Sequence, residues 1–164
     1  MNITIKVKIL LVFVFLAGFV TIGAAQQRFE KAAFYDVMSS GDLDAIINEI
    51  TIVQNSSSPN KQGYEGALLM KQASLEKRPK KKLDLFKAGR IKLETAILAD
   101  NDNTEFHFLR LAIEEHAPKI VKYHADIDND KLIVQKNFKN LSPAVQHAIL
   151  DYTKNSKVLH TGDF

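Results

Sequence analysis

The stretch that decides the fold is TEFHFLRLAIEEH, residues 104–116. Its apolar side chains do not stay on one side of a helix. Phe106, Leu109 and Ile113 share one face, whereas Phe108 and Leu111 lie elsewhere around the cylinder. A helix that is apolar over so much of its circumference has to pack against several neighbours. The stretch therefore predicts a helix at the centre of the domain.

On both sides of this helix the apolar residues recur at helical spacing, and the alternation typical of strands is scarce. We expect helices at about 28–39, from Leu43 through Val53, at about 61–77, 79–99 and 104–116, from about 130 and from 143, with a short segment at 120–124. This order predicts an all-α fold of six or seven helices packed as antiparallel hairpins. A short irregular α-solenoid is one version of that arrangement.

Short-range signals mark several helix ends. Gly41 suits a left-handed residue after the first helix, and Asp42 can cap the second. Pro79 suits an early position of the fourth helix. Ser142 and Pro143 are expected as the cap and first residue of the last helix.

Residues 1–25 have the pattern of a signal peptide. Lys6 and Lys8 form a positive start, residues 9–20 are almost all apolar, and small residues lead up to Ala25. We expect cleavage near Ala25 and export to the periplasm or the medium. The alternative is an uncleaved membrane anchor, because the apolar stretch is about as long as the shortest spans, ~17 residues.

The rest of the chain is expected to form a single α-helical domain over residues 26–158 and a frayed tail over residues 159–164. Without the signal, 20 Lys and Arg stand against 19 Asp and Glu, so the net charge is about +1 and nucleic acid is not an expected partner. The chain holds no Cys, which excludes disulfides, thiolate metal ligands and a thiol nucleophile.

Parts of the chain resemble known helical families. Residues 41–46 resemble the turn of ankyrin and tetratricopeptide hairpins, and Leu93, Ala96 and residues 100–103 resemble the end of a tetratricopeptide unit. A second resemblance, to short exported bacterial α-helical proteins of unassigned activity, rests on residues 103–111, Pro118, Tyr123, Asp130 and Lys131. The first resemblance implies an array of helical hairpins, the second implies a class of short exported helical proteins, and neither implies a reaction.

An acidic run offers a possible calcium loop. Asp126, Asp128 and Asp130 alternate as calcium ligands do, but Lys131 stands where a glycine should turn the loop. Asn137 stands where a glutamate should close it. The run therefore favours a solvated helix start.

Histidines and glutamates offer a possible zinc site. The candidates are His107, Glu114, Glu115, His116 and His124. His107 and His116 are nine residues apart, on opposite sides of one helix, and no His-Glu-x-x-His motif occurs. No Gly-x-Ser-x-Gly motif marks a nucleophile either. We therefore predict no metal, no cofactor and no catalytic residue.

A polar set around the central helix is the candidate binding site: Glu105, His107, Arg110, Glu114, Tyr123 and Asp130. Arg110 precedes Glu114 by four residues, so the two can pair along the helix. The alternative is an internal ion pair that fixes helix packing.

Two surfaces are candidates for partner contact. Phe29, Phe34 and Tyr35 of the first hairpin are aromatic enough to dock a partner, with burial in the core as the alternative. A basic run that can touch an anionic surface consists of Lys77, Arg78, Lys80, Lys81 and Lys82.

The sequence predicts an exported, non-catalytic helical module that binds or scaffolds in the cell envelope. The expected partner is another envelope protein or a peptide. The alternative is a small helical enzyme or ligand carrier with a polar pocket near Arg110.

Overall fold

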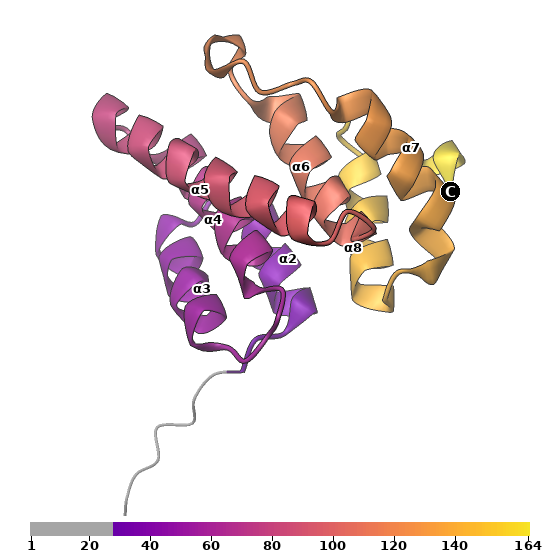
Figure 1. Cartoon of the computed structure of the whole chain (residues 1–164), viewed down its shortest axis with the longest axis horizontal. Helices are drawn as coiled ribbons and strands as arrows, with labels where there is room; N and C mark the ends of the chain where they lie inside the picture. Colours follow the sequence, from indigo (N-terminus) through magenta and orange to yellow (C-terminus); the bar gives the residue numbers. More distant parts are fainter. Residues whose placement is uncertain (1–27) are drawn as a thin grey trace, which may run out of the picture.

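The structure, a computed structural model, describes residues 28–164, so the predicted signal peptide lies outside the described residues. Residues 28–164 form seven α-helices and three short 3₁₀-helices without strands (Figure 1). The α-helices are α2 (Lys31–Ser39), α3 (Leu43–Asn55), α4 (Lys61–Leu75), α5 (Pro79–Ala99), α6 (Thr104–His116), α7 (Ile127–Asn137) and α8 (Pro143–Thr153). The 3₁₀-helices are η1 (Lys119–Val121), η2 (Phe138–Asn140) and η3 (Thr161–Asp163). The predicted all-α fold is confirmed.

Consecutive helices pack as hairpins around one core. The most extensive contact joins α4 to α5, while α3 lies against α4 and α7 packs on α6. α6 also touches α4 and α5, and α8 returns to α2, which brings the last helix back to the first hairpin (Figure 1). All seven helices contribute to one hydrophobic cluster. None of the helices in residues 28–164 has the length and apolar character needed to cross a membrane.

Two glycines let α4 and α5 cross at backbone contact. A Cβ atom added to Gly66 would lie 2.8 Å from the carbonyl oxygen of Gly89, and one added to Gly89 would lie 2.6 Å from the carbonyl oxygen of Gly66. A methyl group at either position would overlap backbone atoms, which cannot rotate away as a side chain can. The close crossing therefore requires glycine on both helices.

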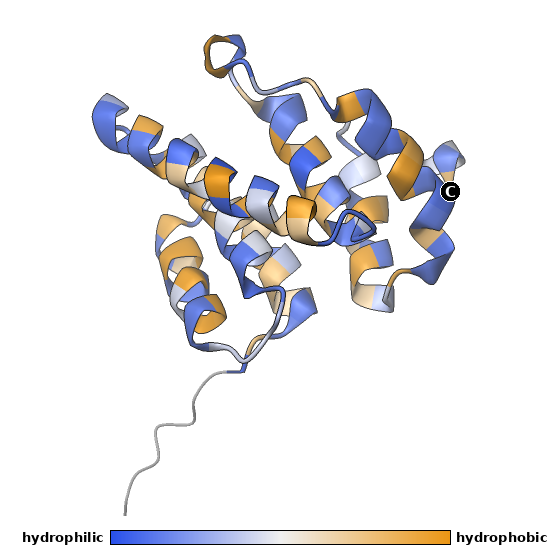
Figure 2. Cartoon of the chain, in the orientation of Figure 1, coloured by the Kyte–Doolittle hydropathy of each residue, from blue (hydrophilic) through white to orange (hydrophobic). Residues whose placement is uncertain are grey.

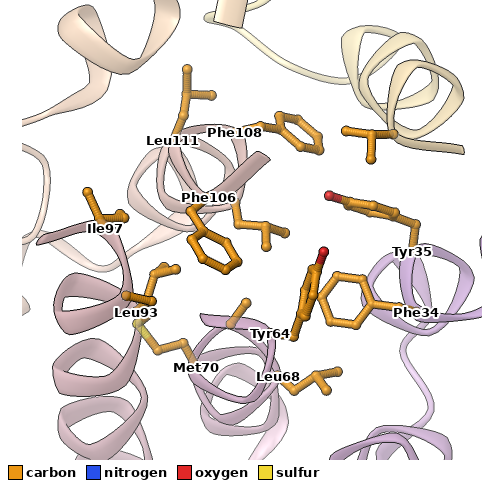
Figure 3. Packing of buried hydrophobic residues seen from close by; sticks show 14 of the residues in the cluster. Phe34, Tyr35, Tyr64, Leu68, Met70, Leu93, Ile97, Phe106, Phe108 and Leu111 are labelled. Atoms are coloured by element: carbon orange, nitrogen blue, oxygen red, sulfur yellow. The ribbon is translucent and has the colours of Figure 1, made fainter. Parts of the chain in front are cut away.

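The helix predicted to be central is central. Phe106 of α6 packs edge-to-face on Tyr64 of α4, with ring centroids 5.6 Å apart, and Tyr64 packs in turn on Phe34 of α2 at 5.0 Å. Leu93 of α5 and Phe108 of α6 are buried in the same cluster (Figure 3). α6 is apolar around its circumference because it touches neighbours on several sides.

Most helix ends follow their short-range signals. Asp42 accepts hydrogen bonds from the backbone N–H groups of Asp44 and Ala45 at 2.9 and 3.2 Å, which confirms it as a cap. Ser142 stands at the predicted cap position, but its side chain makes no capping hydrogen bond. The expectation for Gly41 is wrong: no glycine in residues 28–164 has a positive φ, because the chain leaves α2 through an extended residue, Ser40.

Two boundaries differ from expectation. α7 begins at Ile127, about one turn before the predicted start, because the N–H of Asp130 already donates to the carbonyl of Asp126 at 2.8 Å. The tail is not frayed. Leu159 is fully buried, and the ring of Phe164 lies 4.5 Å from that of Phe138. These two apolar side chains tie residues 159–164 to the domain.

Candidate functional site

The most concentrated polar cluster lies where α5, α6 and α7 meet. Its centre is a bidentate ion pair, in which Arg110 Nε donates to Asp130 Oδ2 and Arg110 Nη2 donates to Asp130 Oδ1, both at 2.7 Å. α6 supplies the arginine and the first turn of α7 supplies the aspartate. Burial lowers the pKa of Arg110, but the hydrogen bonds and charge of Asp130 outweigh it and the net pKa is raised. The guanidinium therefore stays charged.

His107 extends this pair along α6. Its Nδ1 lies 2.6 Å from Asp130 Oδ1, and its Nε2 lies 2.9 Å from the carbonyl oxygen of Asn101. Two acceptor oxygens facing the two ring nitrogens suit the doubly protonated imidazolium. Burial lowers the pKa of His107, but the hydrogen bonds to Asp130 and Asn101 raise it more, so the net pKa lies above its ordinary value.

The outer side of the cluster is formed by α5 and the turn after η1. Glu94 of α5 accepts a hydrogen bond from Arg110 Nη1 at 3.0 Å and another from the hydroxyl of Tyr123. Asp126 Oδ2 lies 3.6 Å from Arg110 Nη1. The guanidinium of Arg90 covers the Tyr123 ring, 4.7 Å from its centroid. Burial, followed by Glu94, raises the pKa of Tyr123, which keeps its hydroxyl protonated as a donor.

The predicted pair between Arg110 and Glu114 does not form. Asp130 and Glu94 already occupy the guanidinium from two other helices. Glu114 instead accepts the backbone N–H of Asp126 at 3.0 Å, and burial raises the pKa of its carboxyl group. Its Oε1 has no hydrogen-bond partner within residues 28–164.

Glu105 belongs to a different cluster. Its carboxylate accepts hydrogen bonds from Lys31 Nζ at 2.5 Å and from the Tyr35 hydroxyl at 3.0 Å, both of which come from α2. Burial and the nearby Glu105 raise the pKa of Tyr64, so this hydroxyl also stays protonated. The structure thus joins Arg110, His107, Asp130 and Tyr123 but separates Glu105 from them.

A polar hollow of about 550 Å³ lies beside Glu105. The residues that line it are Lys31, Asn60, Asp102, Asn103, Thr104, Glu105, Lys136, Asn137, Asn140, Leu141 and Ser142. A second hollow, of about 340 Å³, lies between η2 and the tail and is lined by Phe138 and Phe164 among others. Arg110 lines neither hollow.

The predicted docking surface on the first hairpin is wrong. Phe34 and Tyr35 are both buried, and Phe29 packs on Tyr64 with ring centroids 4.8 Å apart. The sequence could not show what covers them. α8 returns to α2, and the ring of Phe108 lies 6.0 Å from that of Tyr35.

The basic run lies on the surface and is partly paired. Arg78 Nη2 and Lys81 Nζ lie 3.0 and 3.4 Å from Glu76 Oε2. Hydrogen bonds from Arg78 lower the pKa of Glu76 to about 2. Lys77, Lys80 and Lys82 are exposed and make no ion pair within the described part of the chain.

Three participants of the Arg110 cluster were missed from the sequence: Glu94, Asn101 and Asp126. Asp126 carried a usable signal, because it precedes Asp130 by four residues and so lies on the same face at the start of α7. Glu94 gave a weaker indication, because it is an acidic residue next to Leu93 of the predicted apolar face. Asn101 contributes only a backbone carbonyl, which no sequence pattern marks.

The cluster joins α5, α6 and α7 through ion pairs and hydrogen bonds, and we call it the helix clasp. Asp130 is completely buried, and both of its carboxylate oxygens are occupied by Arg110 and His107. A general base needs a lone pair that a substrate can reach, and Asp130 offers none. Residues 28–164 contain no group of three or more His, Cys, Asp or Glu that could hold a metal ion.

No family model, curated protein or solved structure matches this chain. Its class is therefore given by the fold itself, an all-α array of helical hairpins around a central helix.

Proposed function

We propose that this protein is an exported, non-catalytic helical module that binds or scaffolds other components of the cell envelope. The observation that carries the proposal is an apolar stripe on the outer face of α5. Ile91 and Leu98 are 66% and 83% exposed, which is unusual for large aliphatic side chains in the middle and last turn of an ordered helix. They are seven residues apart and so lie on one side.

The α5 stripe consists of Ala88, Ile91, Thr95 and Leu98, all exposed. Their spacing of three, four and three residues is that of a seam against which another helix packs. Gly89 and Leu93 face α4 from the other side of the same helix. Hydrophobic segments recur along α5 in Figure 2. An apolar segment of a second protein is the partner that fits such a stripe.

The polar clusters support binding rather than catalysis. The side chains best suited to a catalytic role are Arg110, His107 and Asp130, and they form hydrogen bonds with one another. Export is supported by the signal pattern of residues 1–25 alone.

A paired set of variants tests the α5 stripe. The double substitution Ile91→Glu with Leu98→Glu should dissociate the protein from its complex in the envelope fraction, measured as a shift to lower mass on native gels. Leu132→Glu is the matched control, because Leu132 of α7 is 66% exposed and outside the stripe. An unchanged complex in the double variant contradicts the proposal.

A ligand carrier is the second candidate, and the polar hollow favours it. It is an open hollow of about 550 Å³ whose lining side chains are polar apart from Leu141, which suits a small polar ligand. The hollow lies beside Glu105, not beside Arg110 as the sequence suggested. Saturable chemical-shift changes at Asn137 and Asn140 on adding a polar metabolite mixture would support this function, and their absence would count against it.

A further inference from the structure

The positive charge of this protein is concentrated on one segment. Residues 77–92 contain eight of the 22 Lys and Arg of the chain but only one of its 19 Asp and Glu, Asp84. The remainder is therefore net acidic. A protein with this distribution presents one strongly positive region, although its net charge is close to zero.

Several of these charges are not used within the fold. Lys92 pairs with Glu65 at 3.0 Å, and Arg90 covers the ring of Tyr123. By contrast, four exposed lysines make no ion pair within residues 28–164: Lys77, Lys80, Lys82 and Lys87. They are available to an external anion.

A second basic element, the turn at η1, carries the most exposed large apolar side chain in residues 28–164. Ile120 is 88% exposed, and its neighbours Lys119 and Lys122 are exposed as well. The turn is held by hydrogen bonds from Val121 N to the Pro118 carbonyl and from Lys122 N to the Lys119 carbonyl, at 3.0 and 3.1 Å. Lys122 adopts φ 49°, the left-handed region that a lysine rarely occupies. The turn therefore keeps Ile120 pointing outward at a backbone cost.

The two elements lie next to each other. Tyr123, which follows the η1 turn, packs edge-to-face on Phe86 of α5 with ring centroids 5.8 Å apart. Leu83 precedes Phe86 by three residues on the same side of α5 and is 44% exposed. In Figure 1 the start of α5 projects at the upper left of the molecule and the η1 turn projects at its top.

We propose that these elements form a basic apex that docks on an anionic phospholipid surface. The basic apex consists of Lys77, Lys80, Lys82, Leu83 and Lys87 of the α5 region with Lys119, Ile120 and Lys122 of the η1 turn. The lysines bind headgroup phosphates, while Ile120 and Leu83 enter the interface between headgroups and acyl chains. The basic apex ends at Lys87 of α5 and the α5 stripe begins at Ala88, so the two surfaces adjoin, and the lipid contact goes beyond the proposed protein partner.

A lipid surface fits the basic apex better than an acidic protein does. The charges are spread over a projecting helix end and a turn tip, and neither described hollow is lined by these residues. All six unpaired cations are lysines, which act as flexible point charges and do not form the fixed forks that select a particular carboxylate. A bilayer requires no shape complementarity from the protein.

Vesicle co-sedimentation tests the basic apex. The purified protein, in whatever processed form the cell releases, is incubated with phosphatidylcholine vesicles or with vesicles in which about one third of the lipid is phosphatidylglycerol. Lys6 and Lys8 favour anionic lipid as well, so the contribution of residues 1–25 is removed by comparing variants that share this segment. We expect at least about tenfold tighter binding to the anionic vesicles, and loss of that preference at about 0.5 M salt.

Two matched pairs of variants locate the contact. The double variant Lys80→Glu with Lys82→Glu should lose most of the anionic preference, whereas Lys136→Glu with Lys139→Glu, an equal charge change in α7 and η2, should retain most of it. Ile120→Ser should weaken binding several-fold, whereas Leu132→Ser, at an exposed position of α7 outside both the α5 stripe and the basic apex, should not.

Three outcomes would overturn the inference. One is equal binding to both kinds of vesicle. Another is an equal loss from both charge pairs, which would show a response to total charge alone. The third is binding to polyglutamate as tight as to vesicles with no effect of Ile120→Ser, which would identify an acidic polypeptide as the partner.

Discussion

Replacing Arg110 by alanine should destabilise this domain severely. The change removes two hydrogen bonds of 2.7 Å to Asp130 and one of 3.0 Å to Glu94. Asp130 is completely buried and, within residues 28–164, keeps only His107 as a charged partner. Removing one member of a buried ion pair costs about 3–5 kcal/mol, because the other charge stays buried without compensation.

A loss of this size is large for one residue. Domains are stable by about 5–15 kcal/mol in total, so Arg110→Ala should remove at least about a fifth of that stability. For a domain of this length the melting temperature should fall by about 8–16 °C. The loss in free energy of unfolding should be about 4 kcal/mol, because the Asp130 side chain is fully buried whereas the Glu94 side chain is 28% exposed to solvent.

Urea unfolding followed by far-UV circular dichroism measures the effect. Arg90→Ala is the control, since Arg90 is exposed and stacks on the Tyr123 ring, an interaction worth about 0.5–1 kcal/mol. The double variant Arg110→Met with Asp130→Leu should recover part of the lost stability, because neither of these two positions then carries a buried charge. A loss below about 1 kcal/mol for Arg110→Ala, or one no larger than for Arg90→Ala, would refute the clasp.

Other predictions concern packing, protonation and capping. Gly89→Ala should lower the free energy of unfolding by about 1–3 kcal/mol, because its Cβ would lie 2.6 Å from an α4 carbonyl oxygen, whereas Gly162→Ala meets nothing within 4 Å and should be neutral. The pKa of His107 is raised in the folded state, so its contribution to the free energy of unfolding should be complete below pH 6.5 and should disappear as the pH rises through the raised pKa. His107→Gln should remove this pH dependence when unfolding is measured at a series of pH values. Asp42→Ala should cost about 1 kcal/mol, whereas Ser142→Ala should be near neutral in the same assay.

Each of these has a contradicting result. Equal stability of the two glycine variants would mean that the helix crossing relaxes freely. A slope above pH 6.5 that persists unchanged in His107→Gln would assign the titration to another group. Equal losses from the Asp42 and Ser142 variants would show that the observed capping bond contributes nothing.

The helices could be predicted where their ends are fixed by neighbouring residues. α5 begins at Pro79 and α6 ends at His116, as expected, because proline, asparagine and apolar periodicity act over a few residues. The pairing of Arg110 could not be predicted. Its acceptors Glu94 and Asp130 are 16 and 20 residues away along the chain, and only helix packing brings them within reach.

Burial of the first hairpin shows the same limit. The sequence around Phe34 and Tyr35 is compatible with either a surface or a core position for these rings. Which of the two occurs depends on α8, which comes from the far end of the sequence and packs on α2. The tail was misjudged for a related reason, since Leu159 and Phe164 are too few to form a periodic pattern but still pack. Long-range contacts therefore decided both cases.

The binding role of α5 is tested most directly by a photo-crosslinking residue placed at position 98 in living cells. The proposal predicts one discrete adduct with an envelope protein, which disappears when Ile91→Glu is added. The same probe at position 132, which is also exposed but lies outside the α5 stripe, should give none. No adduct at position 98, or the same adduct from both positions, would contradict the assignment of this protein as a binding module acting through α5.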